Sequence, residues 1–232
     1  MKKPIVGLVC RKNVIADQAE IVCVEGTRKA LVQAGAICFL IISTQGIDYK
    51  TLDPKEVAPY TEGEKKDLYR ILEMCDAIVM PGGTMWYEMD ELIAKYCIDH
   101  DKPLLGICLG MQLLAKMCLP TSDIVTDPTI ANDTDINHCQ PDIDAVHTVN
   151  IKKNSKLFEI IKEPSIMVNS RHHYHVPEIP EKYVSARSDD GIIEGIEIPD
   201  KKFIVGVQWH PELLYDKDER AKKIIDALLN SI

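Results

Sequence analysis

The sequence of 232 residues has no excess of positive charge, no long apolar run and no paired-cysteine motif. Its formal net charge of -9 would repel phosphate groups, so we expect neither nucleic acid nor an anionic membrane as a partner. No apolar run approaches the length that spans a bilayer. A G-x-x-x-x-G-K-[ST] motif is also missing, so ATP hydrolysis is not predicted. Internal repeats and low-complexity tracts are absent, and a single domain over residues 1–232 is the simplest expectation.

The 8 cysteines form no C-x-x-C pair, and Cys23, Cys38 and Cys118 lie inside apolar runs. Disulfide frameworks are typical of small secreted domains, whereas buried, reduced thiols are typical of proteins in the cytoplasm. We therefore expect reduced cysteines and a cytoplasmic location.

Short apolar runs alternate with helical patterns through the first half of the chain. Strands are predicted at residues 5–9, 37–42, 77–80 and 104–107, and helices at 19–34, 64–74, 88–100 and 109–117. This alternation indicates an α/β fold with a mostly parallel central sheet and helices on both faces.

The second half of the chain has a different pattern. Residues 120–145 are poor in apolar side chains and predict a long surface excursion. Shorter strand-like runs follow, two of them joined by Asp189-Asp190-Gly191, and they predict a small antiparallel β element. The chain closes with a helical pattern that includes Ile224 and Leu228.

The strongest local motif is Gly106-x-Cys108-x-Gly110, between a predicted strand and a predicted helix. A nucleophile on such a sharp turn needs small neighbours so that the backbone can approach closely. Cys108 would lie at a helix N-terminus, where unpaired N–H groups and the helix dipole favour the thiolate. With 12 Gly and 8 Cys in the chain, only about 0.02 such matches are expected by chance. Cys108 is therefore the candidate nucleophile.

A thiolate nucleophile needs a group that takes and returns a proton, and His210 is the best candidate. It ends an apolar strand, where open parallel sheets place their ligands, and Pro211 biases it toward an extended backbone. In extended backbone the side chains of His210 and Glu212 point to the same side, so Glu212 would accept a hydrogen bond from the imidazole. The sequence thus predicts a Cys108, His210 and Glu212 triad.

The turn Met80-Pro81-Gly82-Gly83-Thr84 follows another predicted strand. Backbone N–H groups of Gly82 and Gly83 are exposed to a ligand in such a turn, and the N–H of Leu109 lies beside the nucleophile. We predict that Gly82, Gly83 and Leu109 form an oxyanion hole.

These motifs, in this order along the chain, resemble those of class I glutamine amidotransferases. Residues 168–173 and 186–197 also look like the γ-glutamyl-γ-aminobutyrate hydrolase group, peptidase family C26. The resemblance implies a flavodoxin-like three-layer sandwich and hydrolysis of γ-glutamyl amides, small molecules, without a cofactor. It also implies that the following residues contact the γ-glutamyl part of the substrate: Gln112, Asn169, Ser170, Arg171 and His172.

The resemblance leaves three functions open. The leading one is a hydrolase that cleaves a γ-glutamyl amide through a Cys108 thioester. Leu109 stands where that hydrolase group usually has Arg, and Leu is common in glutaminase domains that feed ammonia to a synthetase. The second function is therefore a glutaminase subunit with a separate synthetase partner, and the third is a catalytically retired binding module. A homodimer is also compatible with the resemblance.

His172, His173 and His175 form a histidine-rich stretch that could indicate a metal site. A usable site needs convergent ligands, usually with a carboxylate or cysteine at regular spacing. The resemblance explains these histidines as part of a loop over the active site, so we expect no metal.

Overall fold

The computed structural model describes residues 2–15, 18–47, 53–118, 136–176 and 178–232. Most of the predicted surface excursion, residues 120–135, therefore lies outside the described residues. The strands are β1 (Ile5–Val9), β2 (Arg11–Ile15), β3 (Gln18–Val22), β4 (Ile37–Ile41), β5 (Ala77–Met80), β6 (Leu104–Ile107), β7 (His147–Ile151), β8 (Ser165–Val168), β9 (Val184–Ser188), β10 (Ile193–Glu197) and β11 (Ile204–Val207). The helices are α1 (Glu25–Gln33), α2 (Glu62–Met74), α3 (Glu88–Asp99), α4 (Leu109–Met117), α5 (Lys156–Ile161) and α6 (Glu219–Asn230), with short 3-10 turns η1 (Pro54–Glu56) and η2 (Pro211–Leu213).

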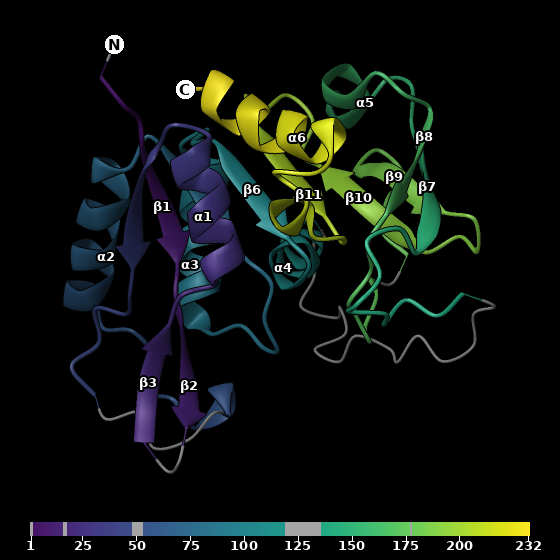
Figure 1. The fold of residues 1–232 in the computed structure, drawn as a ribbon. Coiled ribbons are helices and arrows are strands. Elements are labelled where there is room, and N and C mark those ends of the chain that lie inside the picture. Colours follow the sequence, from purple (N-terminus) through teal and green to yellow (C-terminus); the bar gives the residue numbers. More distant parts are fainter. Residues whose placement is uncertain (1, 16–17, 48–52, 119–135, 177) are drawn as a thin grey trace.

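One nine-stranded sheet, ordered β4-β1-β5-β6-β11-β10-β9-β7-β8, takes strands from both halves of the chain (Figure 1). The pairs from β4 to β11 are parallel, and the pairs from β11 to β8 are antiparallel. The predicted α/β fold is confirmed. The antiparallel strands of the second half continue the main sheet rather than forming a separate layer.

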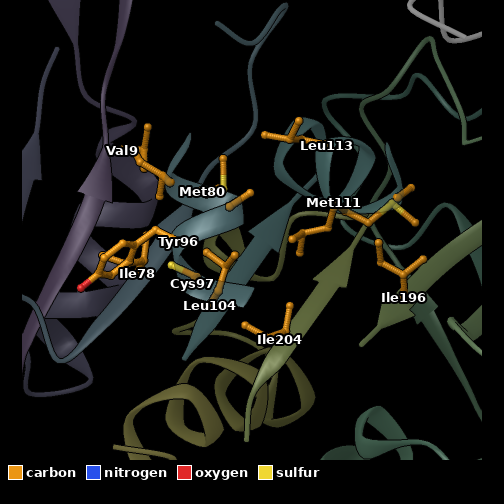
Figure 2. Close-up of a cluster of buried hydrophobic side chains, with 14 of the residues drawn as sticks. Val9, Ile78, Met80, Tyr96, Cys97, Leu104, Met111, Leu113, Ile196 and Ile204 are labelled. Atoms are coloured by element: carbon orange, nitrogen blue, oxygen red, sulfur yellow. The ribbon is translucent and has the colours of Figure 1, made fainter. Parts of the chain in front are cut away.

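Helices cover both faces of this sheet, and each face has its own apolar cluster. On one face, side chains of α2, α3 and α4 pack with β5, β6, β10 and β11; Met80, Leu104, Met111 and Ile196 belong to this cluster (Figure 2). On the other face, α1, α5 and α6 pack against the sheet. Because the central strands are buried on both faces, their sequences read as continuous apolar runs.

A helix over residues 19–34 was predicted, and this prediction is wrong for its first turns. Residues 18–22 form β3, which pairs antiparallel with β2 in a hairpin, and α1 begins only at Glu25. The hairpin extends beyond the end of β1 (Figure 1). Ile21 and Val22 are β-branched and favour a strand, and pairing with β2 gives this segment its backbone partners, so the helix begins after them.

The short helix α5, capped by the side chain of Ser155, was not predicted. Six residues are too few for helical periodicity to be recognised in the sequence. Within the described residues, no helix is long and apolar enough to cross a membrane.

Candidate active site

Cys108 lies at the corner between β6 and α4, with backbone angles φ 50° and ψ -105°. A non-glycine residue with positive φ carries strain of about 1–3 kcal/mol, which persists only where the surroundings fix it. Here the Cys108 N–H donates to Val207 O at 2.8 Å, and its carbonyl accepts from Gln112 N at 3.0 Å. The predicted strand-to-helix elbow is therefore present, and β11 and α4 hold it.

The glycines around Cys108 are required by close packing. A Cβ on Gly106 would lie 2.7 Å from the backbone of Gly110, and one on Gly110 would lie 2.2 Å from Met80 O. Both distances are far below van der Waals contact. The absence of side chains lets the first turn of α4 rest directly on β5, and this contact sets the position of the Cys108 sulfur.

His210 follows β11 and faces Glu212, with 2.7 Å between His210 Nδ1 and Glu212 Oε1. The extended backbone predicted through residue 212 is wrong, because Pro211–Leu213 form the 3-10 turn η2. The turn still brings the carboxylate to the ring. Glu212 is buried, at 4% exposed, so water does not screen this pair effectively.

The environment of His210 favours its charged form. Burial of the ring acts to lower its pKa, but the charge of Glu212 and a hydrogen bond with Cys108 outweigh burial and raise the pKa to about 10. The structure therefore brings Cys108, His210 and Glu212 together, with the imidazole between thiol and carboxylate. At neutral pH this arrangement supports an imidazolium beside the sulfur.

The turn at Gly82 and Gly83 lies against the same two side chains. A Cβ on Gly82 would lie 2.7 Å from His210 Cε1 and 3.5 Å from Cys108 Cβ. A Cβ on Gly83 would approach Leu109 Cδ2 to 3.1 Å. The three residues predicted for the oxyanion hole, Gly82, Gly83 and Leu109, thus surround the nucleophile, and their catalytic role remains a prediction.

Sequence reasoning missed Arg11 and Asp90, which hold this turn in place. Arg11 Nη1 donates to Pro81 O at 2.9 Å and to Gly82 O at 3.3 Å, and Arg11 Nε donates to Asp90 Oδ1 at 2.9 Å. Both side chains are buried. Since Arg11 and Asp90 are far apart in sequence and belong to no motif, only the fold brings them together.

Asn169 contacts the backbone of the candidate base. Its side chain donates to His210 O and accepts from His210 N, each at 2.9 Å. The Gln112 side chain donates to Tyr174 O at 3.0 Å and to Gln208 Oε1 at 3.1 Å. These contacts position β11 and the segment after β8 relative to α4.

The other residues predicted to contact substrate have different surroundings. Ser170 Oγ donates to His138 O at 2.6 Å, and His172 Nδ1 lies 2.9 Å from Tyr174 O. Arg171 is exposed and bonds to Pro141 O. None of these contacts tests a role in substrate binding, so that role stays a prediction for Gln112, Asn169, Ser170, Arg171 and His172.

All 8 cysteines are free thiols in the structure. Burial raises the thiol pKa of six of them, to about 11 for Cys75 and about 12 for Cys118, which keeps them protonated at neutral pH. The six are Cys10, Cys23, Cys38, Cys75, Cys97 and Cys118. They are poor nucleophiles for this reason.

A pocket of about 220 Å³ opens beside the Gly82–Gly83 turn. The β2–β3 hairpin forms one wall, and Arg11, Lys12 and Tyr87 are among its lining residues. The Lys12 ammonium lies 4.5 Å from the centre of the Tyr87 ring. The Arg11 charge is offset by its ion pair with the buried Asp90.

Similarity to known proteins agrees with this geometry. The chain is 28% identical to a glutamine amidotransferase-like protein of Rickettsia prowazekii, over 93% of each chain. It is 27% identical to a CTP synthase of Borreliella burgdorferi over 84% of its own length, and spans 39% of that longer protein. The fold is shared with the glutaminase domain of Trypanosoma brucei CTP synthase, solved with bound acivicin, at a TM-score of 0.60 and 16% identity, covering 99% of this chain and 92% of that one.

The profile of the Peptidase C26 family matches residues 86–212, more than half of the chain. That range includes Cys108, His210 and Glu212. Together with the relatives, the match supports amide hydrolysis by a domain of the glutamine amidotransferase type. The chain belongs to the Peptidase C26 family.

Proposed function

We propose that this protein hydrolyses the side-chain amide of a γ-glutamyl compound and releases glutamate and an amine. The observation that carries the proposal is the buried His210–Glu212 pair, which contacts Cys108 beside the Gly82–Gly83 turn. Nucleophile, proton carrier and oxyanion donors then surround one reacting carbon, as acyl transfer requires.

In the proposed mechanism, the Cys108 thiolate attacks the γ-carbonyl carbon and forms a C–S bond. The carbonyl oxygen becomes an oxyanion beside the Gly83 and Leu109 N–H groups. His210 donates its proton to the amide nitrogen, the C–N bond breaks, and the amine leaves. His210 then takes a proton from water, whose oxygen attacks the γ-glutamyl thioester. The C–S bond breaks, glutamate leaves, and the thiolate–imidazolium pair is restored.

Glu212 supports both proton transfers. Its charge favours the imidazolium, and its hydrogen bond to Nδ1 leaves Nε2 free to face the sulfur and the leaving group. The pocket beside Gly82 gives room for an amine larger than ammonia.

The test compares Cys108→Ala with Cys139→Ala. Cys139 is a matched control because it is also a free thiol next to a histidine, with 3.3 Å between Cys139 Sγ and His173 Nε2. Glutamate release from glutamine and from a panel of γ-glutamyl amines is measured for each protein. We expect Cys108→Ala to lose activity by at least about 10³-fold and Cys139→Ala to retain it. Activity of Cys108→Ala close to that of the unmodified protein would remove Cys108 from the mechanism.

A second candidate function is a glutaminase subunit that passes ammonia to a separate synthetase. Leu109 and the similarity to a CTP synthase favour it. Such a subunit should have very little glutaminase activity alone and much more with its partner. Rapid glutamate release by the purified chain would therefore argue against this function.

The third candidate is a binding module that has lost catalytic activity. A glutamine analogue that carries an electrophile distinguishes it, because a reactive Cys108 should form a covalent adduct detectable by mass spectrometry. Failure to react would favour the binding module. The homodimer and the cytoplasmic location remain predictions from the sequence.

A further inference from the structure

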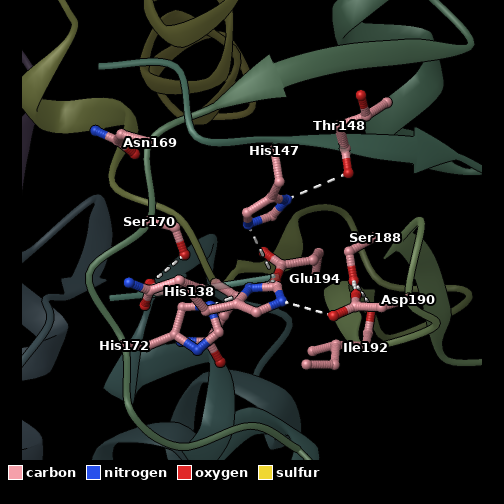
Figure 3. A network of polar contacts seen from close by, with 12 residues as sticks. His138, His147, Thr148, Asn169, Ser170, His172, Ser188, Asp190, Ile192 and Glu194 are labelled. Atoms are coloured by element: carbon pink, nitrogen blue, oxygen red, sulfur yellow. Dashed lines mark hydrogen bonds and ion pairs between the residues drawn. The ribbon is translucent and has the colours of Figure 1, made fainter. Parts of the chain in front are cut away.

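Three histidines and a glutamate meet in the protein interior, on strands and loops of the second half of the chain. His138 precedes β7, His147 begins β7, His172 follows β8, and Glu194 lies on β10 (Figure 3). All four side chains are at most 2% exposed. Each offers one ligand atom, and these atoms all lie within 4.8 Å of one another. We refer to His138, His147, His172 and Glu194 as the histidine–glutamate cluster.

The outer nitrogen of each ring is held by an acceptor. His138 Nε2 lies 3.1 Å from Asp190 Oδ2, His147 Nδ1 lies 3.2 Å from Thr148 O, and His172 Nδ1 lies 2.9 Å from Tyr174 O. Carbonyl and carboxylate oxygens only accept, so each outer nitrogen carries the proton. The inner nitrogen of a neutral ring then presents a lone pair to the centre. Histidines that bind metals have this outer contact almost without exception.

The inner atoms have no hydrogen-bond partner among the described residues. They are His138 Nδ1, His147 Nε2, His172 Nε2 and both carboxylate oxygens of Glu194. The distances from Glu194 Oε1 to the three inner nitrogens are 3.4, 3.8 and 3.4 Å, beyond the usual 2.7–3.2 Å hydrogen-bond range. When the three rings are neutral, all four buried groups present lone pairs to one point, and a cation between them would relieve their repulsion. Protonation of His138 or His172 would also pair the Glu194 charge.

The distances from Glu194 to the three rings are close to those between ligands around one small metal ion. A tetrahedral zinc ion with bonds of about 2.0–2.1 Å holds its ligand atoms about 3.3–3.4 Å apart. Two of the three distances from Glu194 Oε1 are close to this value and the third is longer. The four ligand atoms together lie within 4.8 Å of one another, so the rings would move slightly closer to hold an ion. Three imidazoles and one carboxylate are ligands that suit zinc and related divalent transition metals.

We propose that the histidine–glutamate cluster binds one divalent transition-metal ion of the zinc class. With four protein ligands and no open position, the ion would be structural rather than catalytic. The sequence predicted no metal, because it drew attention to His172, His173 and His175. His173 and His175 are not part of the cluster, and the other three ligands come from separate segments that only the fold brings together.

The site connects segments that also position the candidate base. Asn169, whose side chain holds the backbone of His210, is three residues before the ligand His172. Ser170 lies between them and bonds to the carbonyl of the ligand His138. A bound ion would therefore fix the segment 169–172, and with it the backbone of His210, by joining β7, β10 and the residues after β8.

The experiment measures the metal content of the purified protein. The protein is treated with a chelator, incubated with Zn²⁺ or Co²⁺ and dialysed, and its metal content is measured by mass spectrometry. We expect about one ion per chain, a visible absorption spectrum of tetrahedral Co²⁺, and a higher melting temperature after Zn²⁺ is restored. Cys108→Ala should bind the ion equally well, which separates this proposal from the proposed catalytic function.

Two matched variants locate the site. His172→Gln removes a ligand, whereas His173→Gln changes the exposed neighbouring histidine. The first variant should lose the ion and the Co²⁺ spectrum, and the second should keep both. If the unmodified chain binds neither Zn²⁺ nor Co²⁺, the cluster is held together by protons alone and the proposal is overturned. Equal binding by both variants would overturn it as well. Should His172→Gln not fold, the metal content of the unmodified chain decides.

Discussion

Replacing Gly110 with alanine would test how tightly the nucleophile corner depends on close packing. The added Cβ would lie 2.2 Å from Met80 O, 2.9 Å from Met80 Cβ and 3.0 Å from Met80 C. Such atoms essentially never approach closer than 3.0 Å, so α4 must move away from β5 by at least about 0.8 Å. A backbone oxygen cannot rotate away as a side chain can. We expect a loss of about 1–3 kcal/mol in the free energy of unfolding.

The same movement would displace Cys108, which caps α4. A misplacement of about 1 Å in a reacting group can cost about 10²-fold in rate, so glutamate release should fall by about that factor. Gly46→Ala is the matched control, because Gly46 has no positive φ and no atom lies within 4 Å of its added Cβ. Thermal unfolding and steady-state kinetics are measured for both variants. If Gly110→Ala kept the melting temperature and rate of the control, close packing would not position the nucleophile.

Two further predictions concern His210. In Glu212→Gln the ring loses the charge that raises its pKa to about 10, so its pKa should fall and the alkaline limit of the rate profile should move to lower pH. The raised pKa of His210 also stabilises the folded protein. This stabilisation is fully present below the ordinary pKa of 6.5 and is lost as pH rises toward 10. In Glu212→Gln the melting temperature should therefore fall less across that pH range. In Asn169→Ala, the N–H of His210 loses its side-chain partner and its C=O keeps only Leu213 N–H, so thermal unfolding should show a loss of about 1–3 kcal/mol together with a slower reaction. An unchanged melting temperature in Asn169→Ala would mean that Asn169 does not hold the candidate base.

The parallel and antiparallel halves of the sheet position different residues. The parallel strands β5 and β6 carry the Gly82–Gly83 turn and the Cys108 corner at their carboxyl ends. The antiparallel strands contribute Glu194 and, through the end of β8, Asn169. β11 lies between the halves, pairs parallel with β6 and antiparallel with β10, and leads directly to His210. The candidate active site therefore forms where the sheet changes direction.

The amino-acid sequence by itself determined the features that depend on local chemistry. The alternating apolar runs predicted the parallel strands, because such strands are buried on both faces and leave a continuous pattern. The glycines around Cys108 marked the corner, since only glycine permits that approach of the backbone. The spacing of His210 and Glu212 predicted the contact between imidazole and carboxylate, although the structure makes that contact through a 3-10 turn rather than an extended backbone.

Only the tertiary structure decided the contacts between distant segments. Arg11 and Asp90 leave no pattern in the sequence, yet together they fix the Gly82–Gly83 turn. Residues 19–22 were predicted to begin a helix, but pairing with β2 makes them part of a strand. His138, His147, His172 and Glu194 meet because β7 and β10 lie in the antiparallel part of the same nine-stranded sheet. The local sequence determines the backbone conformation that each residue favours. Burial and long-range pairing depend instead on which surfaces the completed fold brings together.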